Sequence, residues 1–371
     1  MKKLVCIVVV LMLLSGTATV KAVLPTAPEN SGSLLFVSDA ALMGDAERDA
    51  AIWQGISQFA QREGIFCRWE TVTLGSAQSR RAAIERGILQ GATVVICAGY
   101  AYEGVVYQLQ NAYPQVMFLL LDGEPYDREE AVYETAFNTH CITCQEAEAG
   151  FLAGYAAVME GYRNLGFCGS VPVESVNRYG YGFVQGAEQA AADLNLPRGD
   201  VQLRFWYAGE TMEMGQLLAE LGAWYAEGCQ VIFLAEEAGL QVTHSGILAA
   251  TLSGGKVIAA DADRHGKSVS VLSSAVKGYA WSVEEALESL AQNDGFWNTQ
   301  RSGSTMLLWG AQGGVSLALA DSAWRFTQFS REDYEKLLLQ IFEGAITVET
   351  ASGRDVMPEG RLCTLDYLGE G

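Results

Sequence analysis

Histidine is scarce in this chain, with three residues in 371. His140, His244 and His265 share no metal-ligand spacing, and the zinc-binding motif H-E-x-x-H does not occur. The chain also has no G-x-S-x-G nucleophile elbow and no phosphate-binding P-loop. These absences argue against an enzyme, and we expect no catalytic residue, no metal and no cofactor.

Long apolar runs are missing beyond the N-terminus. Residues 1–22, MKKLVCIVVVLMLLSGTATVKA, have a basic start, an apolar run and a small-residue end, which is the pattern of a secretory signal peptide. The apolar run is too short to span a bilayer. We therefore expect an exported protein, periplasmic or on the cell surface, whose mature part does not span a membrane.

Positive charge is also in short supply, because the formal net charge at pH 7 is −20. An acidic chain repels nucleic acid, so we expect no nucleic-acid partner. The cysteines that follow residue 22 are odd in number, which excludes complete internal pairing. The stretch HCITC contains Cys141 and Cys144. A redox pair, half a metal site, a local disulfide and a structural role all remain open for this pair.

Apolar runs alternate with helical patterns along the rest of the chain. SLLFVSD, ATVVICAGY, VMFLLLDG, CQVIFLAEE and KVIAADAD are typical of buried strands. Stretches such as AERDAAIWQGISQFAQREG, between such runs, have the spacing of amphipathic helices. This alternation predicts an α/β fold with parallel sheets and helices on both faces, and the chain length suggests two domains.

Acidic residues end four of the expected strands. In doubly wound sheets, ligands bind in the crevice beyond the carboxyl ends of the strands. The acids in question are Asp39, Asp122, Glu236 with Glu237, and Asp261 with Asp263. Each acid alone could instead cap the next helix, and paired carboxylates could also serve a glycosidase. Several such acids together favour a polar, acid-lined cleft.

Aromatic residues lie near the same strand ends or on the helices that follow them. Carboxylates accept bonds from hydroxyl groups, and aromatic faces stack on flat ligands. An aromatic face next to carboxylates therefore suits a flat or sugar-bearing ligand. The aromatic candidates for the cleft are Trp53, Tyr100, Tyr102, Tyr179, Tyr181, Phe183, Trp206, Tyr207 and Trp281.

Several stretches together resemble the basic membrane protein family, the nucleoside-binding PnrA-like components of ABC importers. QEAEAGFLAGYAAVMEGYRNLGFCGSVPVESVNRYGYGFVQGAEQAA is similar to the central signature of that family. KVIAADAD with the later VSVLSSAVKGYAWSVEEAL resembles its VIGVDVDQ and LTSVVK segments, and AYPQVMFLLLDG resembles its YPDVxFxIID.

The resemblance implies a type I periplasmic binding protein fold, with two doubly wound parallel-sheet lobes joined by three crossovers. Crossovers are expected near Asn138, His265 and Arg301. Lobe 1 would then comprise 33–138 plus 266–301, and lobe 2 would comprise 139–265 plus 302–371.

The resemblance also carries over site residues. Asp261 matches the acid that binds ribose hydroxyls, and Lys277 matches the lysine of LTSVVK. The chain departs from the family at Arg48, which stands where the base-stacking Phe belongs, and at Asp49, which stands where the base-reading Asn belongs. The second stacking Phe is missing from YAGETMEMG. The expected ligand-binding residues are Asp39, Asp49, Trp53, Tyr100, Asp122, Tyr181, Phe183, Glu236, Gly239, Asp261 and Lys277.

The sequence thus predicts an exported solute-binding protein that captures a small polar ligand, by resemblance a nucleoside, for the permease subunits of an ABC importer. Three alternatives stay open: a ligand sensor for a membrane receptor, a nucleoside or glycoside hydrolase, and a surface interaction protein whose pocket binds nothing. Within the site, Asp261 is expected to bind ligand hydroxyls because it directly follows the apolar run. Asp263 is expected to order the following loop.

Overall fold

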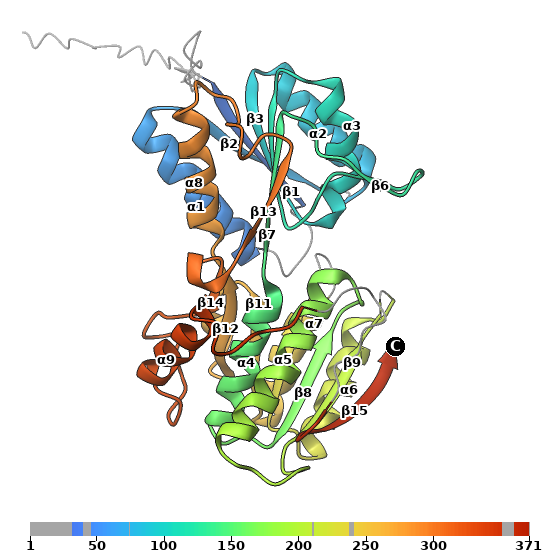
Figure 1. Ribbon diagram of the computed structural model, residues 1–371. Helices are drawn as coiled ribbons and strands as arrows, with labels where there is room; N and C mark the ends of the chain where they lie inside the picture. Colours follow the sequence, from blue (N-terminus) through green and yellow to red (C-terminus); the bar gives the residue numbers. More distant parts are fainter. Residues whose placement is uncertain are drawn as a thin grey trace, which may run out of the picture. The chain divides into compact units, whose positions relative to one another are not determined.

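The computed structural model describes residues 32–39, 46–73, 75–209, 211–236, 241–350 and 360–370 (Figure 1). The expected signal peptide and Gly239 lie outside these residues. The helices are α1 Ala46–Glu63, α2 Ala77–Leu89, α3 Glu103–Ala112, α4 Glu146–Met159, α5 Glu174–Asp193, α6 Met214–Ala226, α7 Val242–Ser253, α8 Tyr279–Ala291 and α9 Arg331–Phe342, with short 3-10 turns η1 Tyr100–Tyr102, η2 His265–Lys267 and η3 Gly310–Gln312. The strands are β1 Ser33–Asp39, β2 Phe66–Val72, β3 Ala92–Ala98, β4 Met117–Leu121, β5 Tyr126–Asp127, β6 Val132–Tyr133, β7 Thr139–Cys144, β8 Asn164–Gly169, β9 Gln202–Tyr207, β10 Val231–Ala235, β11 Lys256–Asp261, β12 Val271–Lys277, β13 Ser304–Leu308, β14 Val315–Leu317 and β15 Thr364–Glu370.

The first sheet has the strand order β13-β7-β4-β3-β1-β2, and all neighbouring strands run parallel. Successive side chains of β1 point to opposite faces and enter different cores. Phe36 packs in one core with Ile52 of α1, and Leu35 packs in another with Ile84 of α2. Helices therefore cover both faces, which explains why these strands are apolar throughout rather than alternating.

The second sheet has the order β14-β12-β11-β10-β8-β9-β15. Its pairs are parallel except for β14, which runs antiparallel to β12. Phe233 of β10 packs against Phe183 of α5, and its neighbour Leu234 packs in a core with Leu221 of α6. This sheet is also doubly wound, so the described residues have the predicted α/β architecture. A two-stranded hairpin of β5 and β6 stands apart from both sheets.

Helices α4 and α5 approach each other so closely that four positions along their contact have room only for glycine. A Cβ atom at Gly150, Gly154, Gly182 or Gly186 would lie 1.9–2.1 Å from a backbone carbonyl oxygen of the facing helix. That distance is far inside van der Waals contact. These four glycines thus permit the backbones of the two helices to pack directly against each other.

The chain passes between the two sheets after β7, after β12 and after β13. The predicted boundaries near Asn138, His265 and Arg301 would have placed 139–144 with the second sheet and 271–277 with the first. The hydrogen bonding instead pairs β7 with β4 and β12 with β11, so each passage lies further along the chain than expected. The grouping of each sheet and its helices into a separate lobe stays a prediction.

The two cysteines of HCITC lie on β7, and both are free and buried. Residues three apart on a strand have Cα atoms about 10 Å apart and side chains on opposite faces, so the pair cannot form a local disulfide. Within the described ranges, no group of three or more potential ligand residues is arranged to hold a metal ion. None of the described helices is both long enough and apolar enough to cross a membrane.

Candidate functional site

Lys277 lies at the centre of a buried group of charges. It is the last residue of β12, and its side chain is only 3% exposed. The ammonium Nζ atom lies 2.9 Å from Asp122 Oδ1, 2.9 Å from Glu146 Oε1 and 3.3 Å from Asp261 Oδ1. An ammonium group has three N–H donors, and here each of them has a carboxylate within reach. Burial by itself lowers the pKa of Lys277, but these carboxylates outweigh it and hold the pKa above its ordinary value.

Two of the three carboxylates stand at the carboxyl ends of strands. Asp122 directly follows β4 of the first sheet, and Asp261 ends β11 of the second. Both adopt a left-handed backbone, with φ of 52° and 69°. Aspartate tolerates this region better than most residues. The turn at each strand end thus brings acids from both sheets to one lysine.

Two tyrosines complete the pairing of these acids. The hydroxyl of Tyr279 donates to Asp122 Oδ2, and the hydroxyl of Tyr179 donates to Asp261 Oδ1 at 2.8 Å. Burial raises the pKa of both hydroxyl groups well above the ordinary value, so they stay protonated and act as donors. Asp261 is the more accessible acid of the two, with a side chain 21% exposed against 9% for Asp122.

Glu146, the first residue of α4, is the third carboxylate of the group, and α4 directly follows β7 in the chain. Arg178 of α5 donates from Nε to Glu146 Oε2 at 2.6 Å, and Lys277 contacts the other oxygen of that carboxylate. Counting Asp122, Asp261 and Glu146 against Lys277 and Arg178, one negative charge is in excess. The group therefore favours a ligand that donates hydrogen bonds and disfavours an anion.

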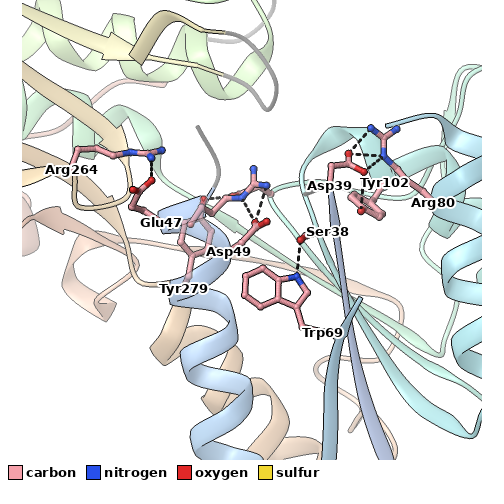
Figure 2. A network of polar contacts seen from close by, with 11 residues as sticks. Ser38, Asp39, Glu47, Asp49, Trp69, Arg80, Tyr102, Arg264 and Tyr279 are labelled. Atoms are coloured by element: carbon pink, nitrogen blue, oxygen red, sulfur yellow. Dashed lines mark hydrogen bonds and ion pairs between the residues drawn. The ribbon is translucent and has the colours of Figure 1, made fainter. Parts of the chain in front are cut away.

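Asp39 and Asp49 are engaged by arginines beside the first sheet. Asp39 Oδ2 accepts from Arg80 at 2.8 Å from Nε and 2.6 Å from Nη2, and both side chains are buried (Figure 2). Asp49 Oδ1 accepts from Nε and Nη2 of Arg48 at 3.2 and 3.1 Å. These acids are therefore neutralised within the protein. Their expected role as ligand residues stays a prediction.

An aromatic pair stands near these acids. The rings of Trp53 and Trp69 are 5.9 Å apart. Trp69 donates from Nε1 to Ser38 Oγ at 2.8 Å (Figure 2). Trp53 is half-buried, and its expected role in ligand binding stays a prediction. Trp69 did not stand out in the sequence, because a tryptophan inside a strand pattern is more often a core residue.

The loop after β11 is ordered by its own charges. Asp263 accepts from the backbone N–H of His265 at 3.0 Å, and its other oxygen lies 2.8 Å from His265 Nδ1. This is the local bonding expected of a loop-ordering residue. Glu47 of α1 pairs with Arg264 (Figure 2). It also pairs with Lys267, and the two ion pairs connect this loop to α1.

The remaining candidates lie elsewhere. The Phe183 ring is fully buried, with its centroid 5.1 Å from that of Phe233, so it is a core residue rather than a cleft residue. Glu236 accepts from Thr243 N at 2.9 Å and thereby caps the first turn of α7. Tyr100 begins η1 and lines a separate cavity between α2 and α3. Tyr181 is half-buried on α5.

Sequence reasoning missed Glu146, Arg178 and Tyr279 as members of the central group. Glu146 gave a signal, because it leads a helix of small apolar residues. Acids at the first turn are so common as helix caps that this signal did not single it out. Tyr279 and Arg178 carry no mark in the sequence that separates them from core or surface residues.

Comparisons with known proteins show which family the chain resembles. The family model described as ABC transporter substrate-binding protein PnrA-like matches residues 33–323. The ABC transporter nucleoside-binding protein BmpA of Lactococcus lactis subsp. cremoris is 24% identical over 201 residues, which cover 53% of this chain and 53% of that protein. The chain thus matches about half the length of that curated relative.

Solved structures share the fold. A solute-binding protein of an ABC transporter system from Aeropyrum pernix K1 has a TM-score of 0.67 at 17% identity, over 87% of this chain and 95% of that one. A transcriptional activator of the comK gene from Bacillus halodurans has a TM-score of 0.65 at 16% identity, over 86% of this chain and 100% of that one. At such identities the likeness concerns the fold alone, which is that of periplasmic binding proteins.

Proposed function

The chain belongs to the family of PnrA-like ABC transporter substrate-binding proteins, and from that premise we propose that it is an exported protein which captures a nucleoside for an ABC importer. The family is one of binding proteins rather than enzymes. The nucleoside, the permease partner and the extracytoplasmic location are all part of the proposal. The name of the Lactococcus relative, a nucleoside-binding protein, supports the choice of ligand.

The observation that carries the proposal is the position of Asp261 and Asp122. Both carboxylates stand at strand ends, where doubly wound sheets bind ligands, and both are held in place by Lys277 and a tyrosine. A carboxylate held in this way accepts bonds from neighbouring hydroxyl groups, such as those of a ribose. Lys277 acts mainly by positioning the acids, because its own N–H donors already face carboxylates.

The charge of the group narrows the ligand further. With one negative charge in excess around Lys277, and with Asp39 and Asp49 each paired to an arginine, no unpaired cation is evident among these groups for a phosphate. We therefore propose an uncharged nucleoside rather than a nucleotide. Calorimetric titration with matched nucleosides and nucleoside monophosphates tests this directly. Tighter binding of the monophosphates would contradict the proposed ligand.

Asp261 is proposed to contact the ligand hydroxyls. A charged acceptor in such a bond contributes roughly 1.5–3 kcal/mol, so Asp261→Ala should weaken nucleoside binding by about ten- to a hundredfold. Asp263→Ala is the matched control, since it removes a carboxylate two residues away that bonds within the loop. It should lower the melting temperature and change the affinity less.

This experiment distinguishes a wrong role for Asp261 from a wrong choice of ligand. Calorimetry that finds Asp261→Ala binding as tightly as the unaltered protein would show that the acids at this strand end are structural. Absence of heat with every nucleoside, in a folded unaltered protein, would remove the nucleoside proposal as a whole.

A further inference from the structure

A cavity that does not include the Lys277 group lies against α4, η3 and α9. It has a volume of about 300 Å³, and its walls include the apolar side chains of Leu152 on α4, Trp309 after β13, and Ile341 and Phe342 on α9. Small-molecule sites begin at about this volume and are mostly apolar with a few placed polar groups. Trp309 is 42% exposed and Phe342 is 68% exposed, so the cavity is open to solvent.

The charged group of this cavity is the carboxylate of Glu148, and Gln312 also lines it. Glu148 lies in the first turn of α4, two residues after Glu146, and is only 6% exposed. Its Oε2 atom accepts from Gly310 N at 2.6 Å. That is its single hydrogen bond among the described residues, and no cation of the described chain pairs with it. Burial raises the pKa of Glu148, in keeping with a carboxylate that lacks a compensating charge.

Other carboxylates of this chain show what a purely structural role requires. Glu160, at the opposite end of α4, accepts from three successive backbone N–H groups of residues 327–329 and from the hydroxyl of Thr327. Although burial works in the other direction, these bonds lower the pKa of Glu160 overall. Glu188 likewise accepts from three successive backbone N–H groups. Each of these carboxylates is well satisfied by the backbone segment that it fastens.

Glu148 differs from these carboxylates in the number of its donors. A carboxylate offers about four acceptor positions, and Gly310 fills one of them. Among the described residues, neither oxygen of Glu148 is both buried and without a partner, so the acceptor positions that Gly310 leaves free are accessible from the open cavity. Capping the short turn η3 explains one bond and leaves the rest of the acceptor capacity facing an apolar cavity.

We propose that this cavity binds a small organic cation, a protonated primary amine carried on an apolar chain or ring. The ammonium group would pair with the Glu148 carboxylate, and the apolar part would pack against Leu152, Ile341 and Phe342. The exposed indole of Trp309 adds a second attraction, because a cation is stabilised over an aromatic face. This site is separate from the one proposed for the nucleoside and does not depend on it.

The test compares two probes of nearly equal shape on the full chain. Phenethylamine is protonated at pH 7 and 2-phenylethanol is neutral, and each is titrated by calorimetry without nucleoside. The amine should bind at least tenfold more tightly than the alcohol. Glu148→Gln keeps an acceptor for Gly310 N–H but removes the charge, so the preference for the amine should disappear. Glu335→Gln makes the same charge change on the exposed face of α9 and should leave the preference intact.

Two results would overturn the proposal. One is equal binding of the two probes, or no binding of either, by the folded protein. The other is an undiminished preference for the amine in Glu148→Gln. If that variant does not fold, Ile341→Trp replaces it, because the larger side chain fills the cavity and leaves the charge in place. Amine binding that survives in Ile341→Trp would equally contradict the site.

Discussion

At the scale of single residues, Lys277 has the largest set of charged partners in the central group. Its ammonium is surrounded by Asp122, Asp261 and Glu146, and all four side chains are mostly buried. Removing one partner of a buried ion pair is strongly destabilising, because the charges left behind are neither solvated nor paired. The residue therefore matters for stability before it matters for binding.

Lys277→Met keeps the shape of the side chain and removes its charge. We expect a loss of about 3–5 kcal/mol in the free energy of unfolding, measured by denaturant titration. Lys336→Met is the control, since Lys336 is exposed on α9 and pairs with Glu332 at the surface, where an ion pair contributes at most about 1 kcal/mol. If the two variants lose equal stability, the buried group does not depend on its central cation.

At the scale of elements, the contact between α4 and α5 leaves no room for a Cβ atom at four glycines. Gly150 faces the carbonyl oxygen of Tyr179, and a Cβ atom there would lie 2.1 Å from it. Gly150→Ala should therefore force the helices apart and cost about 1–3 kcal/mol or more. Gly222→Ala on α6 is a matched control with open space around the new Cβ, and it should stabilise the protein by about 0.5–1 kcal/mol. Thermal melts of both variants give opposite shifts if the packing is as described.

Strand β7 contains a histidine that couples stability to pH. His140 is fully buried beside Trp297, and burial lowers its pKa to about 4 from an ordinary 6.5. The folded state holds the neutral ring, so its contribution is complete above pH 6.5 and is lost as the pH falls toward 4. His140→Phe removes this titration. The drop in unfolding free energy between pH 7 and pH 4 should be smaller in the variant by at most about 3 kcal/mol. Parallel curves for the two proteins would show that the ring is not held neutral.

Strand β7 is an element whose position in the fold could not be predicted from the sequence. The apolar runs of β1, β3, β4, β10 and β11 predicted strands that the structure contains. The stretch HCITC mixes polar and apolar residues and was expected to enter the second lobe. It pairs instead between β4 and β13, one of which lies far along the chain. Pairing between distant strands leaves no local pattern, so the positions of the passages could not be derived.

Some residues of the site could likewise be named from the sequence, and others are identified only from their contacts in the structure. Asp122 and Asp261 could be named because each follows or ends an apolar run, and Lys277 could be named because its segment resembles the LTSVVK segment of the family. The structure brings the three together. Phe183 could not be told from a cleft residue, since a buried ring and a stacking ring have the same sequence pattern. Glu146 is identified only when its distance to Lys277 is known.

At the scale of the whole molecule, ligand binding should raise thermal stability. A ligand that binds only the folded state at 100 times its dissociation constant adds roughly 2.7 kcal/mol. For a chain of this length such an increment shifts the melting temperature by several degrees. A thermal-shift panel of nucleosides should show this increase, and Asp261→Ala should show less of it at the same concentration. A panel without any shift would speak against nucleoside capture.

The three passages between the sheets also govern the order in which the protein can be completed during synthesis. The first sheet acquires its edge strand β13 only when residues 304–308 have been made, and the second acquires β14 and β15 later still. Each sheet therefore waits for segments from the last fifth of the chain, and early-made strands such as β7 keep an unpaired edge until then. An unpaired strand edge can pair with another chain, so the partly made protein is most prone to aggregation before its last fifth has been made.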